Sequence, residues 1–264
     1  MEILLAVIFT LLGISIGSFL NVVIDRLPAG GSLVSPPSRC DACQRRLTPV
    51  DLVPVFSYLG LRGRCRYCGA CIPRRVLLVE VVSGLFFFLA FWRFDLSAEF
   101  LITAFWGCIF IVIIFIDWEN KLILNKVTYP AAVVALIILA VDSFLPGRLF
   151  SYLIFHPEPS ILSGVIGGAI GFLFFMMVFL INPRGMGMGD VKLACLIGLV
   201  MGFPLGIVAL FIGIVIGGLV AATLFLLKKK GRKEAIPYGT FLALGPMVTM
   251  LWGTDILRWY LNLF

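Results

Sequence analysis

The sequence contains few charged residues for its length. Asp, Glu, Lys and Arg make up 13% of its 264 residues, whereas 61% are hydrophobic, and the mean hydropathy is +1.10. Because about a quarter of the residues in soluble globular domains are charged, this composition excludes that class. We therefore expect the chain to lie in a lipid bilayer. Its length allows about eight spans of about 20 residues, with one polar segment left over.

Histidine is nearly absent. His156 is the only one in the chain, and it lies in a stretch that we expect to be a solvated outer loop. A serine-histidine pair and an HExxH metalloprotease site both need histidine next to the reacting groups. Neither chemistry is available to a membrane site in this sequence.

The first apolar run, residues 3–24, lacks the basic start and the small-residue cleavage site of a secretory signal. We interpret it as a retained helix. Seven more apolar runs follow, at residues 76–92, 100–116, 127–141, 161–181, 191–202, 205–227 and 238–256. The sequence therefore predicts an all-α polytopic membrane protein with about eight transmembrane helices.

The distribution of basic residues predicts the orientation. Residues 25–75 include nine Arg and three Asp, and positively charged loops stay in the cytoplasm. We therefore expect the N-terminus outside and the loops 117–126, 182–190 and 228–233, each with Lys or Arg, on the cytoplasmic side. The net charge of +7 is explained by this orientation and by contact with anionic membrane lipid. Nucleic acid is not expected as a partner.

Residues 25–75 also contain two C-x2-C motifs separated by 21 residues. Four thiolates at such spacing suit tetrahedral zinc, and they let a segment too small for its own core fold around the metal. The alternative is a set of reduced free thiols. Cys71 is a further candidate ligand, although the symmetry of the two motifs favours the other four. We predict a small cytoplasmic zinc-binding segment whose ligands are Cys40, Cys43, Cys65 and Cys68.

Two carboxylates lie at the ends of apolar runs. Asp117 closes the run 100–116, and Asp190 stands before the run 191–202, on the same predicted side. Carboxylates at membrane depth are costly and are functional candidates. In aspartyl proteolysis, an ionised carboxylate takes a proton from water and a protonated one donates to the scissile carbonyl. We therefore predict that Asp117 and Asp190 are catalytic; for Asp117, an ion pair with Lys121 is the alternative.

Glycine alternates with other residues ahead of Asp190, at Gly185, Gly187 and Gly189. Because glycine has no side chain, another backbone can approach closely at these positions. We predict that an extended substrate peptide pairs with this loop in the manner of a strand. An ordinary flexible loop is the alternative.

Motifs spread over nearly the whole chain resemble those of the type IV prepilin peptidases, bacterial bifunctional enzymes of the GxGD aspartyl protease class. The matching stretches are Gly17–Ile24, Arg26–Pro28, Ser38–Cys40, Asp51–Leu59, Leu61–Cys65, Val79–Glu80, Ile116–Asp117, Gly187–Lys192 and Ile236–Gly239. One departure follows the first aspartate, where the family often has Ile-Pro-Asp and this chain has Ile123-Leu124-Asn125.

The resemblance implies an enzyme of the bacterial inner membrane that cleaves the basic leader from prepilins or pseudopilins. It further implies N-methylation of the new N-terminal residue, with S-adenosylmethionine as the methyl donor. Asp117 and Asp190 match the catalytic aspartates of the family, and the four cysteines match its zinc ligands. Glu80 is the first candidate for contact with the methyl donor. Its alternative role is as an interfacial partner for Arg74 or Arg75.

We expect three parts: a first transmembrane helix (1–24), a cytoplasmic four-cysteine zinc-binding segment (25–75) and a seven-helix membrane peptidase domain (76–264) with its active site on the cytoplasmic side. Two alternative functions make different predictions. A proton-coupled transporter should have an inverted repeat with broken helices, and no such repeat is found in the sequence. A zinc-bearing membrane scaffold would give no reason for an acid behind alternating glycines.

Overall fold

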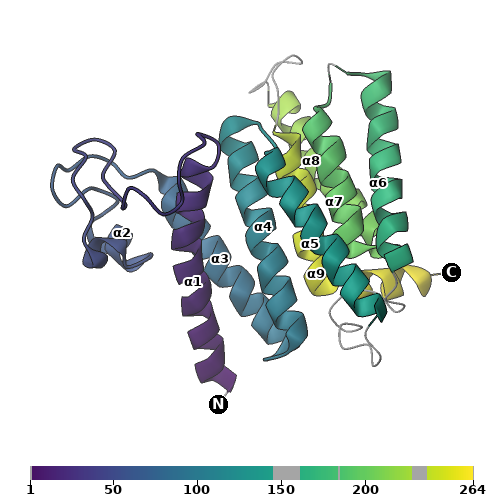
Figure 1. Cartoon of the computed structure of the whole chain (residues 1–264), viewed down its shortest axis with the longest axis horizontal. Helices are drawn as coiled ribbons and strands as arrows, with labels where there is room; N and C mark the ends of the chain where they lie inside the picture. The colour runs from purple at the N-terminus through teal and green to yellow at the C-terminus, as the bar shows by residue number, and fades with distance from the viewer. Residues whose placement is uncertain (1, 145–160, 184, 228–236, 264) are drawn as a thin grey trace. The chain divides into compact units, whose positions relative to one another are not determined.

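The computed structural model describes residues 2–144, 161–183, 185–227 and 237–263, and these are almost entirely helical (Figure 1). The elements are α1 (Glu2–Arg26), the 3-10 helix η1 (Pro49–Leu52), α2 (Phe56–Gly60), α3 (Arg74–Phe94), α4 (Ala98–Asn120), α5 (Asn125–Phe144), α6 (Ile161–Ile181), α7 (Met188–Met201), α8 (Leu205–Leu226) and α9 (Tyr238–Leu261). Strand pairing in this part of the chain is limited to two isolated bridges. His156 and the predicted loop 228–233 lie outside the described residues.

The predicted membrane helices are confirmed as helices, with one difference in length. Within the described ranges, seven helices are long and apolar enough to cross a membrane, namely α1, α3, α4, α5, α6, α8 and α9. The eighth predicted run forms α7, which has 14 residues and is therefore about 21 Å long, less than the hydrocarbon thickness of about 30 Å. Ten residues of α7 are buried, because α5, α6, α8 and α9 all pack against it.

The contacts group the chain into two compact units, Met1–Leu96 and Ser97–Phe264. This grouping does not follow the predicted boundary at residue 76, because α3 packs against α1 within the first unit. The functional division into residues 1–24, 25–75 and 76–264 stays a prediction.

In the first unit, α1 and α3 approach closely through glycine. An added Cβ on Gly13 would lie 2.9 Å from the carbonyl oxygen of Ser83, and one on Gly17 would lie 2.8 Å from the Cα of Glu80. The order of these pairs makes the two helices antiparallel. Small residues at such a seam allow the close packing that holds helices together in lipid.

In the second unit, α6 and α7 meet along a similar seam. An added Cβ on Gly167 would lie 2.5 Å from the carbonyl oxygen of Gly198, and one on Gly171 would lie 2.5 Å from that of Ala194. Backbone therefore packs directly on backbone over about one turn of each helix. Neither glycine can be replaced without moving the helices apart.

The seam ends in a polar clasp between Ser163 and Phe203. The hydroxyl of Ser163 donates to the carbonyl oxygen of Phe203 (2.9 Å). In return, the amide of Phe203 donates to the carbonyl oxygen (3.1 Å) and the Oγ (3.2 Å) of Ser163. The clasp joins the beginning of α6 to the residues that follow α7.

The links α4–α5 and α6–α7 lie at the same end of the second unit (Figure 1). Asp117 is near the end of α4, and Asp190 is in the first turn of α7. The helix order therefore brings both carboxylates to one end, opposite the clasp.

Candidate functional site

Asp117 is buried and turned toward α9. Its Oδ2 accepts hydrogen bonds from the backbone amide of Thr240 (2.6 Å) and from the Thr240 hydroxyl (3.0 Å), whose proton is shared with the carbonyl oxygen of Ile114 (3.2 Å). Amides in the first turn of a helix have no intrahelical acceptor, so the carboxylate satisfies one of them at the beginning of α9. Lys121, considered above as an ion-pair partner, contacts Asp117 through its backbone amide, 2.8 Å from the Asp117 carbonyl oxygen.

Asp190 is also buried, and its Oδ2 accepts a hydrogen bond from the amide of Gly187 (3.2 Å). An acid three residues after the N-cap can bond back to the N-cap amide and so help to start the helix. Asp190 lies close enough to Asp117 for their charges to interact. The structure thus brings together the two acids that the sequence singled out.

Ile123, in the link between α4 and α5, packs against glycines beside both acids. An added Cβ on Gly189 would lie 3.0 Å from the Cβ of Ile123. One on Gly239 would lie 2.7 Å from Ile123 Cδ1 and 3.1 Å from Asp117 Oδ2. Both glycines therefore allow three chain segments to converge at the carboxylates.

The glycine-rich loop differs from the expectation at one of its three glycines. Gly189 lies in the first turn of α7 and packs on Ile123, because the helix already begins at Met188. A helical residue cannot pair as a strand. Gly185 and Gly187 precede the helix and are exposed, and substrate pairing at these two positions stays a prediction.

Asn125, at the departure from the family motif, links α5 to α7. Its Oδ1 accepts a hydrogen bond from Lys192 Nζ (3.0 Å), and the same ammonium lies 5.2 Å from the centre of the Tyr129 ring. A cation over an aromatic face is attracted to it. Lys192 therefore fastens the beginning of α7 to that of α5.

Two residues of this site were not identified from the sequence. Thr240 directly follows the matching stretch Ile236–Gly239, and a polar side chain next to glycine at the start of an apolar run was the available signal. Ile123 was named only as the first residue of Ile123-Leu124-Asn125, the stretch that departs from the family motif. Its contact with two glycines distant in sequence has no local signal.

The four predicted zinc ligands form a cluster in the first unit. Their Sγ atoms all lie within 4.8 Å of one another, and those of Cys40 and Cys68 are 3.7 Å apart. Tetrahedral zinc with bonds of about 2.3 Å places its sulfur ligands about 3.8 Å apart, so the four thiols fit this metal. Cys71 is outside the cluster, and its backbone forms an isolated antiparallel β-bridge with that of Arg64.

The two C-x2-C turns have the same backbone geometry. In the first, the amide of Gln44 donates to the carbonyl oxygen of Cys40 (2.8 Å). In the second, the amide of Gly69 donates to that of Cys65 (2.9 Å). Gln44 and Gly69 both have positive φ, 57° and 72°. The symmetry inferred from spacing is therefore present in the chain path.

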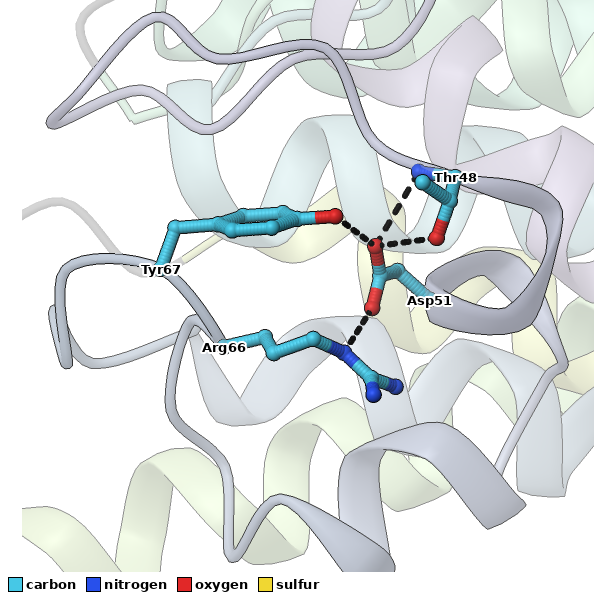
Figure 2. A network of polar contacts seen from close by, with 4 residues as sticks. All are labelled: Thr48, Asp51, Arg66 and Tyr67. Carbon is cyan, nitrogen blue, oxygen red and sulfur yellow. Dashed lines mark hydrogen bonds and ion pairs between the residues drawn. The ribbon is translucent and has the colours of Figure 1, made fainter.

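Asp51 connects η1 to the second of these turns (Figure 2). Its carboxylate accepts hydrogen bonds from the hydroxyl (2.7 Å) and amide (3.0 Å) of Thr48, from Arg66 Nε (2.6 Å) and from the Tyr67 hydroxyl (3.1 Å). These bonds, that from the Thr48 hydroxyl above all, hold the pKa of Asp51 well below its usual range. Arg66 and Tyr67 lie between Cys65 and Cys68, so the network braces the cluster.

Glu80 is only 4% exposed, and its Oε2 accepts a hydrogen bond from the amide of Val55 (2.7 Å). Val55 has φ 62° and ψ −54°, a region that a β-branched residue rarely adopts. Arg75, one of the alternative partners of Glu80, pairs with Asp25 and donates to Asn21 Oδ1 (3.1 Å). Glu80 therefore holds the chain at Val55 in an unusual conformation.

Comparison with known proteins identifies the family of this chain. Residues 11–94 match the Bacterial Peptidase A24 N-terminal domain, and residues 104–222 match the Type IV leader peptidase family. A protein of Bacillus subtilis (strain 168) described as "Prepilin leader peptidase/N-methyltransferase" is 30% identical over 260 residues, which cover 98% of this chain and 99% of the relative.

Two further relatives have the same description. The protein of Stutzerimonas stutzeri is 30% identical over 277 residues, covering 95% of this chain and 92% of the relative. That of Pseudomonas aeruginosa is 27% identical over 283 residues, covering 96% and 92%. Among solved structures, none gives a significant match.

The apolar helices and the family match define a helical membrane protein of the aspartic peptidase class. The chain belongs to the type IV leader peptidase family. This membership does not favour the transporter or the scaffold considered from the sequence.

Proposed function

We propose that this protein is an intramembrane aspartyl endopeptidase that removes the basic leader from prepilins or pseudopilins and then N-methylates the new N-terminal residue. The observation that carries the proposal is the pair of buried carboxylates, Asp117 and Asp190, which come from different helices and whose neighbouring glycines, Gly239 and Gly189, both pack on Ile123. Membership of the family and the shared description of the relatives support both activities.

In the proposed cleavage, Asp117 is the base and Asp190 the acid. Hydrogen bonds donated to a carboxylate favour its ionised form, and Asp117 receives two from Thr240. Asp117 takes a proton from water as the water oxygen bonds to the scissile carbonyl carbon, and Asp190 protonates the carbonyl oxygen. When the C–N bond breaks, the leaving amine takes a proton from the pair. The two acids share protons and therefore titrate together.

We propose that Cys40, Cys43, Cys65 and Cys68 hold a structural zinc ion. The metal would fix the two C-x2-C turns in a segment with too few apolar residues for a core of its own. The many arginines of this segment favour the cytoplasmic face of the inner membrane for it. We assign the active site to the same face, as the alternation of helices predicts.

The methyl donor in this proposal is S-adenosylmethionine, which supplies an electrophilic methyl group to the free amine when bound. Glu80 was its first candidate contact. Because this carboxylate is buried and already bonded to Val55, it fits a role in positioning the neighbouring loop better than direct contact with a charged cofactor.

Purified protein in detergent, incubated with a prepilin and labelled S-adenosylmethionine, should yield a shortened and methylated pilin. Asp117→Asn and Asp190→Asn should each abolish cleavage, because an amide can neither act as the base nor share the proton. Glu119→Gln is a matched control, since Glu119 is exposed and only two residues from Asp117. Substantial cleavage by either Asn variant would remove that residue from the mechanism.

Methyl transfer should be separable from proteolysis, because the acids are needed only to break the peptide bond. A leader-cleaved pilin offered to Asp117→Asn with S-adenosylmethionine should still be methylated. Loss of this methylation in both well-folded Asn variants would mean that one site performs both reactions.

A further inference from the structure

Residues 49–60, which contain η1 and α2 and are called here the apolar loop, form an uncharged island in a basic segment. Asp51 is its only charged residue. Between residues 26 and 75, four arginines precede the apolar loop and five follow it. Such an arrangement of apolar residues between clustered basic ones is typical of segments that lie in the membrane interface.

The apolar side chains of this loop point away from the protein. Phe56 is 64% exposed, and Leu59, three residues later, lies on the same side of α2. The large exposed hydrophobic residues of the loop are Val50, Leu52, Val53, Phe56 and Leu59. The two short helices that carry four of them and flank Val53 pack against each other, so the exposed apolar groups are gathered on one small structural element.

The polar groups of the loop point the other way. The side chain of Asp51 is 4% exposed, because Thr48, Arg66 and Tyr67 bond to its carboxylate (Figure 2). The hydroxyl of Tyr58 lies 3.4 Å from the carbonyl oxygen of Ile72. The one charge is therefore hidden from the exposed apolar side of the loop.

The bond between Val55 and Glu80 ties the apolar loop to α3. Glu80 is the seventh residue of α3, which places its Cα about 9 Å along a helix that is about 30 Å long. Arg74 and Arg75 mark the beginning of this helix, where basic residues meet lipid headgroups. The Val55 amide donates to Glu80 Oε2 (2.7 Å), so the apolar loop is tied to a residue of α3 that lies nearly two turns past these arginines.

We propose that the apolar loop inserts into the interfacial region of the cytoplasmic leaflet, with Phe56 and Leu59 among the acyl chains and Glu80 as its anchor to α3. The arginines on both sides of the loop suit a leaflet with anionic headgroups. The inference goes beyond the peptidase and methyltransferase activities and depends on neither.

The test places a fluorescent amino acid at position 56 of the full-length chain, in vesicles of phosphatidylethanolamine and phosphatidylglycerol. Position 42 is the control, because Ala42 is exposed in the same segment but belongs to the first C-x2-C turn. Lipids brominated near the headgroup should quench position 56 several-fold more strongly than position 42. Iodide in the aqueous phase should quench position 42 more strongly than position 56.

Equal access of iodide to both positions would overturn the insertion. Protection of position 56 from both quenchers would also overturn it, in favour of a protein partner for the loop. Glu80→Gln keeps an oxygen that can accept from the Val55 amide, whereas Glu80→Leu does not. Bromolipid quenching at position 56 should therefore fall in Glu80→Leu and persist in Glu80→Gln. Unchanged quenching in a folded Glu80→Leu protein that retains its metal would show that Glu80 is not the anchor.

Discussion

Thr240 donates two hydrogen bonds to a single oxygen of Asp117, one from its backbone and one from its side chain, at 2.6 and 3.0 Å. The two residues are 123 positions apart in the chain, and they join the end of α4 to the beginning of α9. The orientation of the proposed base therefore depends on a helix that contributes no acid to the pair.

Thr240→Val should lower the rate of prepilin cleavage about tenfold or more, because it removes one hydrogen bond to a charged group. The backbone donor and the volume of the side chain are retained. Thr240→Ser keeps the hydroxyl and should stay near the wild-type rate. Measurement of kcat for both variants tests the role of the hydroxyl. Equal rates in Thr240→Val and Thr240→Ser would mean that the hydroxyl is not used.

Gly239→Ala should impair cleavage by pressing a methyl group against Ile123 and Asp117, at 2.7 and 3.1 Å. Overpacking of this kind typically costs about 1–3 kcal/mol. Ile123→Val removes Cδ1, the atom nearest to the new methyl group, so the double variant should recover part of the activity. A double-mutant cycle on cleavage rates measures this coupling; additive losses would show that Ile123 is not the residue displaced.

Purified protein should contain about one zinc ion per chain, held by four thiolates. Cys68→Ser should lose most of the metal, whereas Cys71→Ser should keep it, because Cys71 lies outside the cluster. Elemental analysis of protein prepared without chelators measures both. Loss of zinc in Cys71→Ser, or its retention in Cys68→Ser, would require a different set of ligands.

Asp51 should make the metal-binding segment sensitive to acid. Hydrogen bonds from Thr48, Arg66 and Tyr67 depress the pKa of Asp51 in the folded state. Its stabilising contribution is therefore complete above the unfolded value of about 3.9 and is lost as the pH falls below it toward the folded pKa. The difference in protease resistance between the wild type and Asp51→Asn should be constant near neutral pH and shrink below about pH 4. A difference that grew on acidification would contradict this sign.

Local patterns in the sequence were sufficient for features that depend on neighbouring residues. The run 161–181 coincides with α6, Ile161–Ile181, because the bilayer requires an uninterrupted apolar helix. The spacing of Cys40, Cys43, Cys65 and Cys68 likewise predicted a cluster, since each pair occupies one tight turn. The symmetry of the two motifs already favoured these four residues over Cys71, and in the structure Cys71 lies outside the cluster.

Contacts between remote positions could not be predicted in this way. Local hydropathy does not show that Thr240 meets Asp117, or that Ile123 packs on Gly189 and Gly239. The beginning of α7 was placed at Val191 rather than Met188, because the bond from the Gly187 amide to Asp190 starts the helix ahead of its apolar run. The catalytic role of the acids stays a prediction that only activity can test.

The seam between α6 and α7 does not by itself fix the register of the two helices, and so it does not fix the position of Asp190 along the axis of α7. Glycines spaced about one turn apart form a smooth track, and sliding α7 by one turn would again bring small residues face to face. The clasp between Ser163 and Phe203 selects one of these registers. It does so from the far end of the helix, 13 residues or about 20 Å from Asp190. The clasp therefore fixes the position of α7 along α6. Ser163→Ala should therefore reduce cleavage although it touches neither acid, and unchanged kcat in that variant would leave the register to other contacts.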